Sequence, residues 1–304
     1  MLSLHTNAAA LSTENALATT QMQLNNSLTA LGTGYRVNSS SDDAAGLQIA
    51  TRLQSQTQGM QQAQSNAANG TSMLQTADGA LNETSNILLR MKDLATQAAT
   101  ASSSSADQSA MQSEYDALGT QLGQIIQGST FGGQGLFSSG TASSANAGSG
   151  GALSSAMTFQ IGDQSTDTMT LNASSQLTSM AADFVSVSAN YAVATAVTGT
   201  EITGTSQATG VTGAQAMITA LTTAISAVGA MRSTLGAGVN RLNSVSNNLT
   251  NMITNTTAAT GQIMDVDYAS ETAKSSAAQL QMQAGTAALK QANSMASLVV
   301  TLLQ

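Results

Sequence analysis

The stretch AAGLQIATRLQSQTQGMQQAQSNAANGTSMLQTADGALNETSNILLRMKDLATQAAT, residues 44–100, decides the fold. Apolar or small residues recur in it every seven positions: Leu53, Met60, Ala67, Leu74, Leu81, Leu88 and Ala95. Seven-residue spacing places a stripe along one side of a helix, and another helix must cover that stripe. A helix from Ala44 to Thr100 would be roughly 85 Å long at 1.5 Å per residue, a length typical of rods.

The same spacing returns after Gly213, and it again predicts a long helix. The series is Ala214, Leu221, Val228, Leu235, Leu242, Leu249, Thr256 and Ile263. This second helix would be roughly 74 Å long. Two long helices of similar length on either side of a loop-rich centre predict an antiparallel hairpin. Asp267 is placed to cap a final helix that continues to the C-terminus.

Both ends of the chain carry shorter versions of this pattern. Near the start the series is Ala10, Leu17, Leu24 and Leu31; near the end it is Met282, Leu289, Ala296 and Leu303. Neither segment is long enough to be a stable helix alone in water. We therefore expect the terminal helices to pair with each other and with neighbouring copies. The residues predicted to carry this polymerisation are Leu17, Leu24, Leu31, Met282, Leu289 and Leu303.

Shorter signals lie between these helices. Ser40 with Asp43 resembles a capping box, and Ser105 with Gln108 is predicted to cap a further helix. Alternation in 157–161 and 169–171 around a polar turn predicts a β-hairpin. Residues 172–212 suggest strand-like stretches and a short helix near Met180.

Composition supports a thin helical fold. The 304 residues include no Trp, Pro or Cys, and only four Phe and four Tyr, so large aromatic cores are not expected. The predicted fold class is mainly α: an elongated antiparallel helical bundle or coiled-coil rod with a small β-hairpin region at the centre of the chain. With only 8% charged residues, few charges would need desolvation when subunits pack together.

Several function classes are disfavoured. The net charge is −8 and the eight Lys and Arg are spread along the chain, so nucleic-acid binding is not expected. No uninterrupted apolar run approaches the roughly 18 residues that cross a bilayer, so no membrane insertion is expected. The first basic residue is Arg36, which argues against a secretory signal peptide.

Catalytic, metal and cofactor sites are not expected either. The lone His5 cannot hold zinc, which needs three or four ligands. Asp265 and Asp267 are better explained as caps at a helix start than as a cation site. The turn from Asp163 to Asp167 lacks the Gly and the terminal Glu of an EF-hand loop. Nucleophile and phosphate-binding motifs are absent, so we predict that the protein is not an enzyme.

The chain resembles bacterial flagellin in two sets of motifs. The amino-terminal set is Asn38-Ser-Ser-Ser-Asp-Asp-Ala-Ala-Gly-Leu47, Ile49-Ala-Thr-Arg52, Gly79-Ala-Leu-Asn-Glu83 and Arg90-Met-Lys-Asp-Leu-Ala-Thr-Gln97. The carboxy-terminal set is Leu235-Gly-Ala237, Asn240-Arg-Leu-Asn243, Asp265-Val-Asp-Tyr-Ala269, Gln283-Ala-Gly-Thr286 and Gln291-Ala-Asn293. The opening Met1-Leu-Ser-Leu-His-Thr-Asn7 and the ending Leu302-Leu-Gln304 are most similar to lateral-type flagellins. Two positions depart from the family pattern: Gly261-Gln262 stand just before Ile263, where many flagellins carry a basic residue, and the chain ends in Gln304, where Arg is common.

The resemblance implies a domain organisation. Residues 1–38 and 262–304 would form the terminal coiled-coil domain D0, and 39–175 with 212–261 the helical rod domain D1, separated by a short variable segment, 176–211. It also implies terminal helices that are disordered in the monomer and fold in the filament.

The implied function is that of a structural subunit of the extracellular flagellar filament, used for swimming or swarming. The implied partners are other copies of the chain, the flagellar type III export apparatus, and chaperone, cap and junction proteins. Two alternatives remain open: a hook–filament junction protein, and an extracellular coiled-coil adhesin.

Arg90, Leu94 and Glu114 match flagellin positions associated with the vertebrate innate receptor TLR5. Because Arg90 and Leu94 are four residues apart, they would lie on one face of a helix. Glu114 would lie on the next helix, folded back alongside. The alternative is that Leu94 packs inward and the two charged groups simply face solvent.

Overall fold

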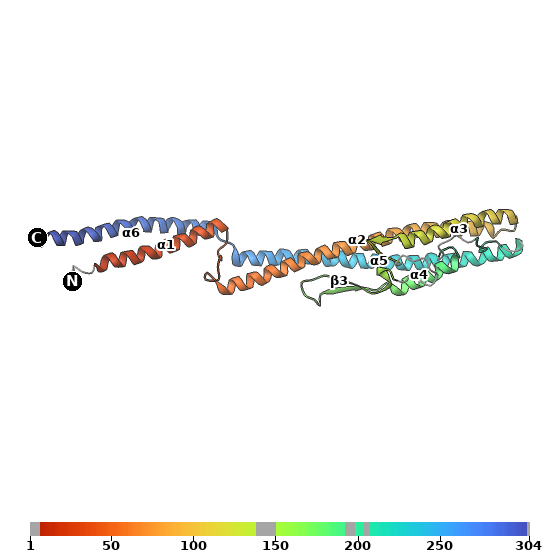
Figure 1. The fold of residues 1–304 in the computed structure, drawn as a ribbon, viewed down its shortest axis with the longest axis horizontal. Helices are drawn as coiled ribbons and strands as arrows, with labels where there is room; N and C mark the ends of the chain where they lie inside the picture. Colours follow the sequence, from red (N-terminus) through yellow and green to blue (C-terminus); the bar gives the residue numbers. More distant parts are fainter. Residues whose placement is uncertain (1–6, 138–149, 192–197, 204–206, 303–304) are drawn as a thin grey trace. The chain divides into compact units, whose positions relative to one another are not determined.

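The computed structural model describes residues 7–137, 150–191, 198–203 and 207–302 (Figure 1). For residues 207 and 295–302 it describes the backbone and not the side chains. His5 and Leu303 lie outside the described residues. Contacts divide the chain into two compact units. We call residues 1–58 with 253–304 the terminal unit, and residues 59–252 the central unit.

The described elements are mostly helices. In chain order they are α1 (Ala8–Thr33), α2 (Ala44–Ala98), α3 (Ser105–Gly128), β1 (Thr130–Phe131), β2 (Gln134–Gly135), η1 (Ala152–Ser154), β3 (Met157–Gln160), β4 (Thr168–Leu171), α4 (Ser174–Val187), α5 (Gln207–Met264) and α6 (Tyr268–Leu302). Both predicted long helices are confirmed, with 55 residues in α2 and 58 in α5. The predicted fold class, a helical bundle with a small hairpin, is confirmed.

The core of the central unit lies along the predicted seven-residue series. Leu74, Leu81 and Leu88 of α2 are fully buried. The corresponding positions of α5 are also fully buried: Leu221, Leu235 and Leu242. Tyr115 of α3 joins this core, and its hydroxyl donates a hydrogen bond of 2.8 Å to the carbonyl of Val187. Burial raises the pKa of the Tyr115 phenol well above its ordinary value, so this donor keeps its proton.

The predicted β-hairpin is confirmed in the central unit. Strands β3 and β4 pair antiparallel, with Met157 opposite Leu171. Glycines on the long helices make room for it: a Cβ added at Gly70 would lie 2.8 Å from the Phe159 ring, and one at Gly238 would lie 3.0 Å from Leu171. The hairpin side chains therefore rest almost directly on helix backbone.

The short helix expected near Met180 is confirmed, because residues 174–187 form helix α4. The strand-like stretches expected in 172–212 are wrong for the described part of that region, which contains no strand. Leu177, Met180, Phe184 and Val187 are buried and recur every three or four residues. This helical period outweighs the local β-propensity of Thr and Val. Phe184 also packs edge-on against Tyr191, with ring centroids 5.2 Å apart.

Two predicted helix caps are wrong by small shifts. Helix α3 is capped by Ser104 with Asp107, which form a reciprocal capping box, whereas the Gln108 side chain is buried and donates to the carbonyl of Ala98. At the start of α2, Asp43 itself accepts from the amide of Gly46 at 2.8 Å, so it acts as the cap in place of Ser40. The sequence has several neighbouring Ser and Asp residues near the start of each helix, and any of them could act as the N-cap.

At that same start, Asp42 belongs to the preceding turn. It accepts hydrogen bonds from the amides of Ser39 and Asn38, which hold the pKa of its carboxyl below the ordinary value. Asp42 therefore stabilises the turn, and Asp43 stabilises the helix.

One helix passes a length and hydropathy test for crossing a membrane. Within Ala208–Met264 an 18-residue window reaches a mean hydropathy of 1.4. The expectation from apolar runs missed this helix, because Thr, Ser, Gly and Gln interrupt its apolar runs. Composition of this kind is weak evidence for a span. Packing also explains the apolar character of this helix, because Leu221, Val228 and Leu235 are buried in the core of the central unit.

Candidate functional site

The terminal unit pairs the two ends of the chain. Helices α1 and α6 lie side by side and run antiparallel (Figure 1). At one end the Asn7 amide donates to the carbonyl of Ala292 at 3.0 Å. Towards the other end the Ser27 hydroxyl donates to Glu271 at 2.5 Å. The predicted pairing of the terminal helices with each other is therefore present within one chain.

Two connecting segments fix the register of this pair. The amide and the guanidinium of Arg36 donate to the carbonyls of Met264 and Ile263, at 2.6 and 2.7 Å. In return the Val266 amide donates to the carbonyl of Gly34 at 3.0 Å. Gly34 has a φ of 78°, a left-handed conformation that glycine adopts without strain. This short two-stranded bridge brings the end of α1 to the start of α6.

Asp267 caps α6 as predicted. Its carboxylate accepts from the amides of Ala269 and Ser270, at 3.0 and 3.3 Å. The bridge and the cap together define where the last helix begins.

The predicted polymerisation residues that the structure describes, all but Leu303, lie in the seam between α1 and α6. Leu24 is 6% exposed, whereas Leu17, Leu31, Met282 and Leu289 are half-buried. The other buried seam positions are small: Ser27, Ala30, Ser275 and Ala278. The structure thus shows these side chains contributing to a thin intrachain seam, and their role between copies stays a prediction.

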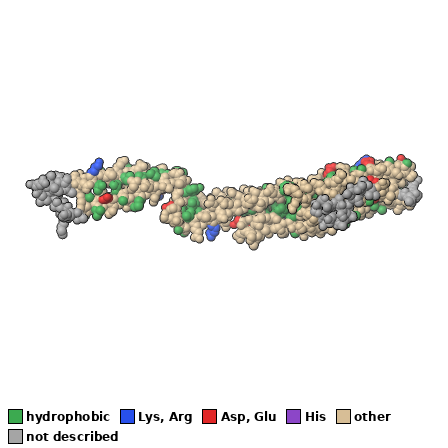
Figure 2. Space-filling view, viewed as in Figure 1, with side chains coloured by type: hydrophobic (Ala, Val, Ile, Leu, Met, Phe, Trp, Pro, Cys, Tyr) green, Lys and Arg blue, Asp and Glu red, His purple; other side chains and the backbone are tan. Residues whose placement is uncertain are grey.

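Further apolar side chains are exposed on the outward sides of α1 and α6, one set on each side of the pair, and the sequence analysis missed them. Leu11 is 56% exposed, Met22 60% and Leu280 66%. At about 100° per residue, Leu11 and Met22 lie about 20° apart, and Leu24 lies about 160° round the helix from Met22. Figure 2 shows apolar side chains exposed over these helices. The eleven-residue spacing of Leu11 and Met22 could have indicated this exposed face, but the sequence analysis considered only seven-residue repeats.

The outer face of α6 is extended by small side chains. Ala273, Ala284 and Ala287 share the face of Leu280 and are exposed. Small residues let another helix approach closely. The terminal unit therefore offers apolar surface on the sides that face away from its own seam.

One carboxylate sits at the edge of the seam. Besides the bond from Ser27, Glu271 forms an ion pair of 3.1 Å with Lys274, and its side chain is 14% exposed. The Ser27 hydrogen bond, helped by Lys274, lowers the pKa of Glu271 below its ordinary value of 4.5. The α1–α6 contact therefore favours the ionised carboxylate.

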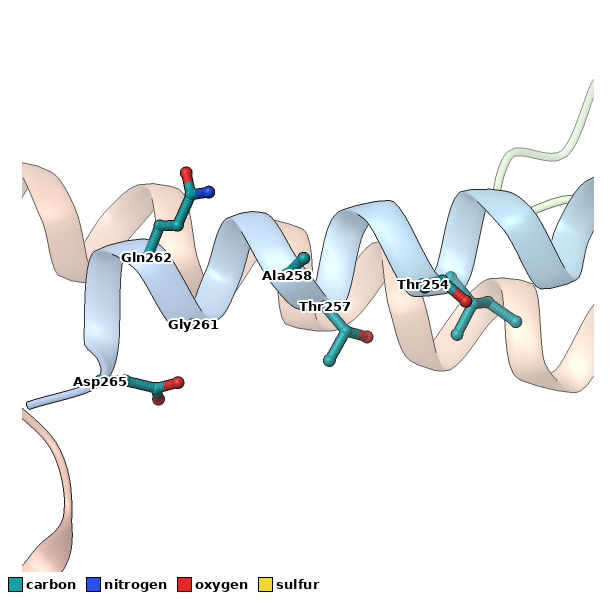
Figure 3. Close-up of a pocket in the computed structure, with 7 residues that line it drawn as sticks. Thr254, Thr257, Ala258, Gly261, Gln262 and Asp265 are labelled. Atoms are coloured by element: carbon teal, nitrogen blue, oxygen red, sulfur yellow. The ribbon is translucent and has the colours of Figure 1, made fainter.

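An open groove lies along the end of α5, within the terminal unit (Figure 3). Its volume is about 790 Å³, and it is lined by Ile253, Thr254, Thr257, Ala258, Gly261, Gln262 and Asp265. All but Asp265 come from α5. The lining contains one carboxylate, Asp265, and no other titratable side chain beside it. The lining residues of this groove therefore form no catalytic centre.

The Arg90–Glu114 pair lies in the central unit. The guanidinium donates to the Glu114 carboxylate at 2.6 and 2.9 Å, and both side chains are about half exposed. The structure thus brings these two predicted residues together. Leu94 is only 2% exposed and packs in the core, so the expected apolar member of the patch is buried. The exposed apolar neighbour on α2 is Leu89, at 49%.

Chemical sites are sparse in the described part of the chain. It holds no group of three or more His, Cys, Asp or Glu side chains that could bind a metal ion. Its buried side-chain polar atoms all have hydrogen-bond partners. The fold and this surface define a class: a helical structural protein with apolar surface exposed on its paired ends.

Comparison with known proteins places this class in a family. The family model of the bacterial flagellin N-terminal helical region matches residues 4–143, and that of the C-terminal helical region matches residues 218–303. Together these ranges cover well over half of the chain. The chain belongs to the bacterial flagellin family.

Individual relatives agree with this assignment. A stretch of 135 residues, 44% of this chain, is 48% identical to the B-type flagellin of Pseudomonas aeruginosa and covers 28% of it. A stretch of the same length is 45% identical to polar flagellin F of Vibrio parahaemolyticus and covers 36% of it. The matched part thus spans about a third of the length of these relatives.

A solved structure from Vibrio parahaemolyticus, provisionally named a flagellar hook-associated protein, shares the fold. Its TM-score is 0.53 at 19% identity, and the match covers 74% of this chain and all of that one. At this identity the likeness concerns the fold alone.

Proposed function

We propose that this protein is the structural subunit of a flagellar filament, and that the terminal unit carries its polymerisation. The observation that carries the proposal is the apolar surface left uncovered on the outside of the α1–α6 pair, at Leu11, Met22 and Leu280. Family membership supports it. The terminal unit corresponds broadly to the proposed domain D0, and the central unit to most of D1.

Physical reasoning supports the terminal unit as the assembly element. Two helices that meet through Ser, Ala and half-buried Leu bury little area per residue, so their pairing alone is marginal. Copies that cover the outer apolar face would add the missing burial at about 25 cal/mol per Å². Assembly and ordering of the terminal helices are then coupled, in keeping with terminal helices that are disordered in the free monomer.

Truncation tests the proposal directly. Deleting residues 1–31 or 278–304 should leave a folded central unit that forms no filaments, measured by sedimentation and electron microscopy. A finer test replaces Leu280 with Ser, with Gln281→Ser as the matched control on the exposed surface of the same helix. We expect loss of filaments with the first and normal filaments with the second. Long filaments from either truncated chain would reject the proposal.

The route to the filament is the flagellar type III export channel, with chaperone, cap and junction proteins as further partners. Support comes from family membership and from a sequence without Cys, in which disulfides cannot block passage of an unfolded chain. Secretion by a strain that lacks the flagellar export apparatus would contradict this route. Assignment to the lateral type rests on the terminal motifs alone.

Recognition by TLR5 is a further part of the proposal, in a revised form. The exposed Arg90–Glu114 pair supports it, and buried Leu94 is left out of the surface. A reporter assay should show weaker signalling from monomeric Arg90→Ala, Glu114→Ala protein than from the unchanged monomer. Equal signalling from both proteins would remove the pair from the recognition surface.

A hook–filament junction protein is the second candidate. The fold likeness to the structure named as hook-associated favours it. A junction protein should not form long filaments by itself. Electron microscopy of the purified full chain therefore separates the two functions.

A further inference from the structure

The sequence contains a single Asn-Gly pair, Asn69–Gly70, which lies within α2 in the central unit. This dipeptide is chemically labile, because glycine has no side chain to hinder attack of its backbone nitrogen on the preceding side-chain amide. Asn69 is exposed, and its side-chain amide has no hydrogen-bond partner among the residues that the structure describes. Reaction at Asn69 is therefore limited by the backbone and not by contacts of its side chain.

Packing requires glycine at position 70. A Cβ added there would lie 2.8 Å from the Phe159 ring of β3 and 3.2 Å from Leu242 of α5. A larger residue would have to displace these neighbours. One turn earlier, the Asn66 side-chain amide donates to the carbonyl of Gln160 at 3.5 Å. The hairpin thus rests on the turn of α2 that contains the labile pair.

The helical conformation blocks the reaction at this pair. Ring closure needs the Gly70 nitrogen to approach the Asn69 side-chain carbonyl carbon, which requires a backbone torsion outside the α-helical range. Backbone N–H groups inside an α-helix also donate to the carbonyl four residues earlier, and Gly70 lies well inside α2. The pair can therefore react only after local unfolding of this part of the helix.

We propose that Asn69–Gly70 is a deamidation site that is closed when α2 folds beneath the hairpin, so that deamidation marks chains that have remained unfolded. In the unfolded chain the Gly70 nitrogen bonds to the Asn69 Cγ and loses its proton. The bond from Cγ to the side-chain nitrogen breaks, and ammonia leaves. Water then opens the succinimide ring to aspartate or isoaspartate.

The isoaspartate product has a structural consequence. Its main chain runs through the side-chain carbons of residue 69, so one extra backbone atom precedes Gly70. The helical hydrogen bonds lose their register at this turn, and the glycine backbone moves away from the Phe159 ring. Chains with isoaspartate should therefore refold with a lower melting temperature, whereas ordinary aspartate at this exposed position should have little effect. These properties depend on the central unit alone, and filament assembly plays no part in them.

The test incubates the full-length chain in mildly alkaline buffer, either native or unfolded in guanidinium chloride. Mass spectrometry follows deamidation at each Asn, and a protein-isoaspartate methyltransferase with S-adenosylmethionine measures isoaspartate. In the unfolded chain Asn69 should react faster than Asn86, which is also exposed on α2 but precedes Ile87. In the native chain the Asn69 rate should fall at least about tenfold, because only the opened fraction of the helix reacts. Asn69→Gln protein is the control and should gain little isoaspartate in either state.

Matched variants test the part played by the hairpin. Phe159→Ala removes the ring that covers Gly70 and should raise the native rate at Asn69 several-fold. Thr158→Ala changes an exposed neighbour on β3 and should leave that rate unchanged. Circular dichroism checks that both variants stay folded. Equal Asn69 rates in the native and the unfolded chain would overturn the inference, as would a native rate that Phe159→Ala did not change. An unchanged melting temperature of refolded isoaspartate-containing chains would overturn it as well.

Discussion

The two units of this chain use similar helices in opposite ways. In the central unit, α2 and α5 bury Leu74, Leu88 and Leu235 completely. In the terminal unit, Leu24 is the most buried of the large apolar side chains of α1, at 6% exposed, and Met22 is 60% exposed. Seven-residue patterns occur in both. What differs is the number of partners within the chain: α3, α4 and the hairpin cover the long helices, whereas α1 and α6 have mainly each other.

The difference teaches that the central unit is complete as a folded body and the terminal unit is not. A dense core transmits the loss of a single methylene to overall stability. A thin pair with open apolar faces should instead lose assembly before it loses monomer stability. The predictions below test this contrast, from the largest effect to the smallest.

Emptying the central core should have the largest effect. Leu88→Ala removes a fully buried side chain and should lower the free energy of unfolding by about 2–5 kcal/mol. The adjacent Leu89 is 49% exposed, so Leu89→Ala is the matched control and should change it by less than about 0.5 kcal/mol. Urea unfolding followed by circular dichroism measures both. Similar losses from the two variants would show that the central core is not packed as described.

The same glycine-to-alanine change should have opposite signs in the two units. A Cβ at Gly123 of α3 would lie 2.6 Å from the backbone carbonyl oxygen of Tyr191, so Gly123→Ala should destabilise by about 1–3 kcal/mol. Gly32 of α1 has nothing within 4 Å of an added Cβ, and Gly32→Ala should stabilise α1 by about 0.5–1 kcal/mol.

Gly79→Ala provides the control within the central unit. It lies in α2 with open space around it and should also stabilise. The melting temperatures of the three variants, compared with that of the unchanged chain, test whether Gly123→Ala destabilises and the other two stabilise. A destabilising Gly79→Ala would mean that helix propensity and packing cannot be separated in this way.

The terminal seam should respond to pH through Glu271. Its pKa is lowered in the folded chain by the Ser27 hydrogen bond, so its contribution is fully present above the ordinary value of 4.5 and is lost as pH falls through the folded pKa. Glu271→Gln should weaken α1–α6 pairing by about 1 kcal/mol at neutral pH. The difference from the unchanged chain should disappear under acid conditions.

Helix content and melting between about pH 3 and about pH 7 measure this dependence. Ser27→Ala serves as the partner control, because it removes the hydrogen bond and leaves the carboxylate. A difference between Glu271→Gln and the unchanged chain that stayed constant through acid pH would contradict the assignment.

The sequence predicted the features that depend on the periodicity of apolar residues. It missed features for which several neighbouring residues were equally suitable. The buried series of α2 and α5 followed from spacing, and the hairpin followed from alternation around a polar turn. The cap of α3 was off by one residue, since Ser104 and Ser105 offer the same hydroxyl. Helix α4 was only partly foreseen, because Thr and Val favour strands until a core is present to cover Phe184.

The candidate site was harder to predict for a physical reason. A seven-residue pattern identifies the stripe that one partner covers, and Leu17 and Leu24 indeed face α6. It says nothing of the opposite face, where Leu11 and Leu280 lie. Likewise spacing placed Arg90 and Leu94 on one side of α2, but only the packing of α3 shows that Leu94 is buried while Arg90 reaches Glu114.

The smallest effect should come from the Arg90–Glu114 pair. Both side chains are about half exposed, so water and salt screen their attraction, and such pairs contribute about 0.2–1 kcal/mol. Arg90→Ala should therefore leave the melting of the central unit almost unchanged, in contrast to Leu94→Ala, which opens a cavity in the core. A double-mutant cycle with Glu114→Ala, repeated at low and high salt, measures the coupling. A coupling above about 2 kcal/mol that high salt did not reduce would mean that the pair is part of the structural core after all.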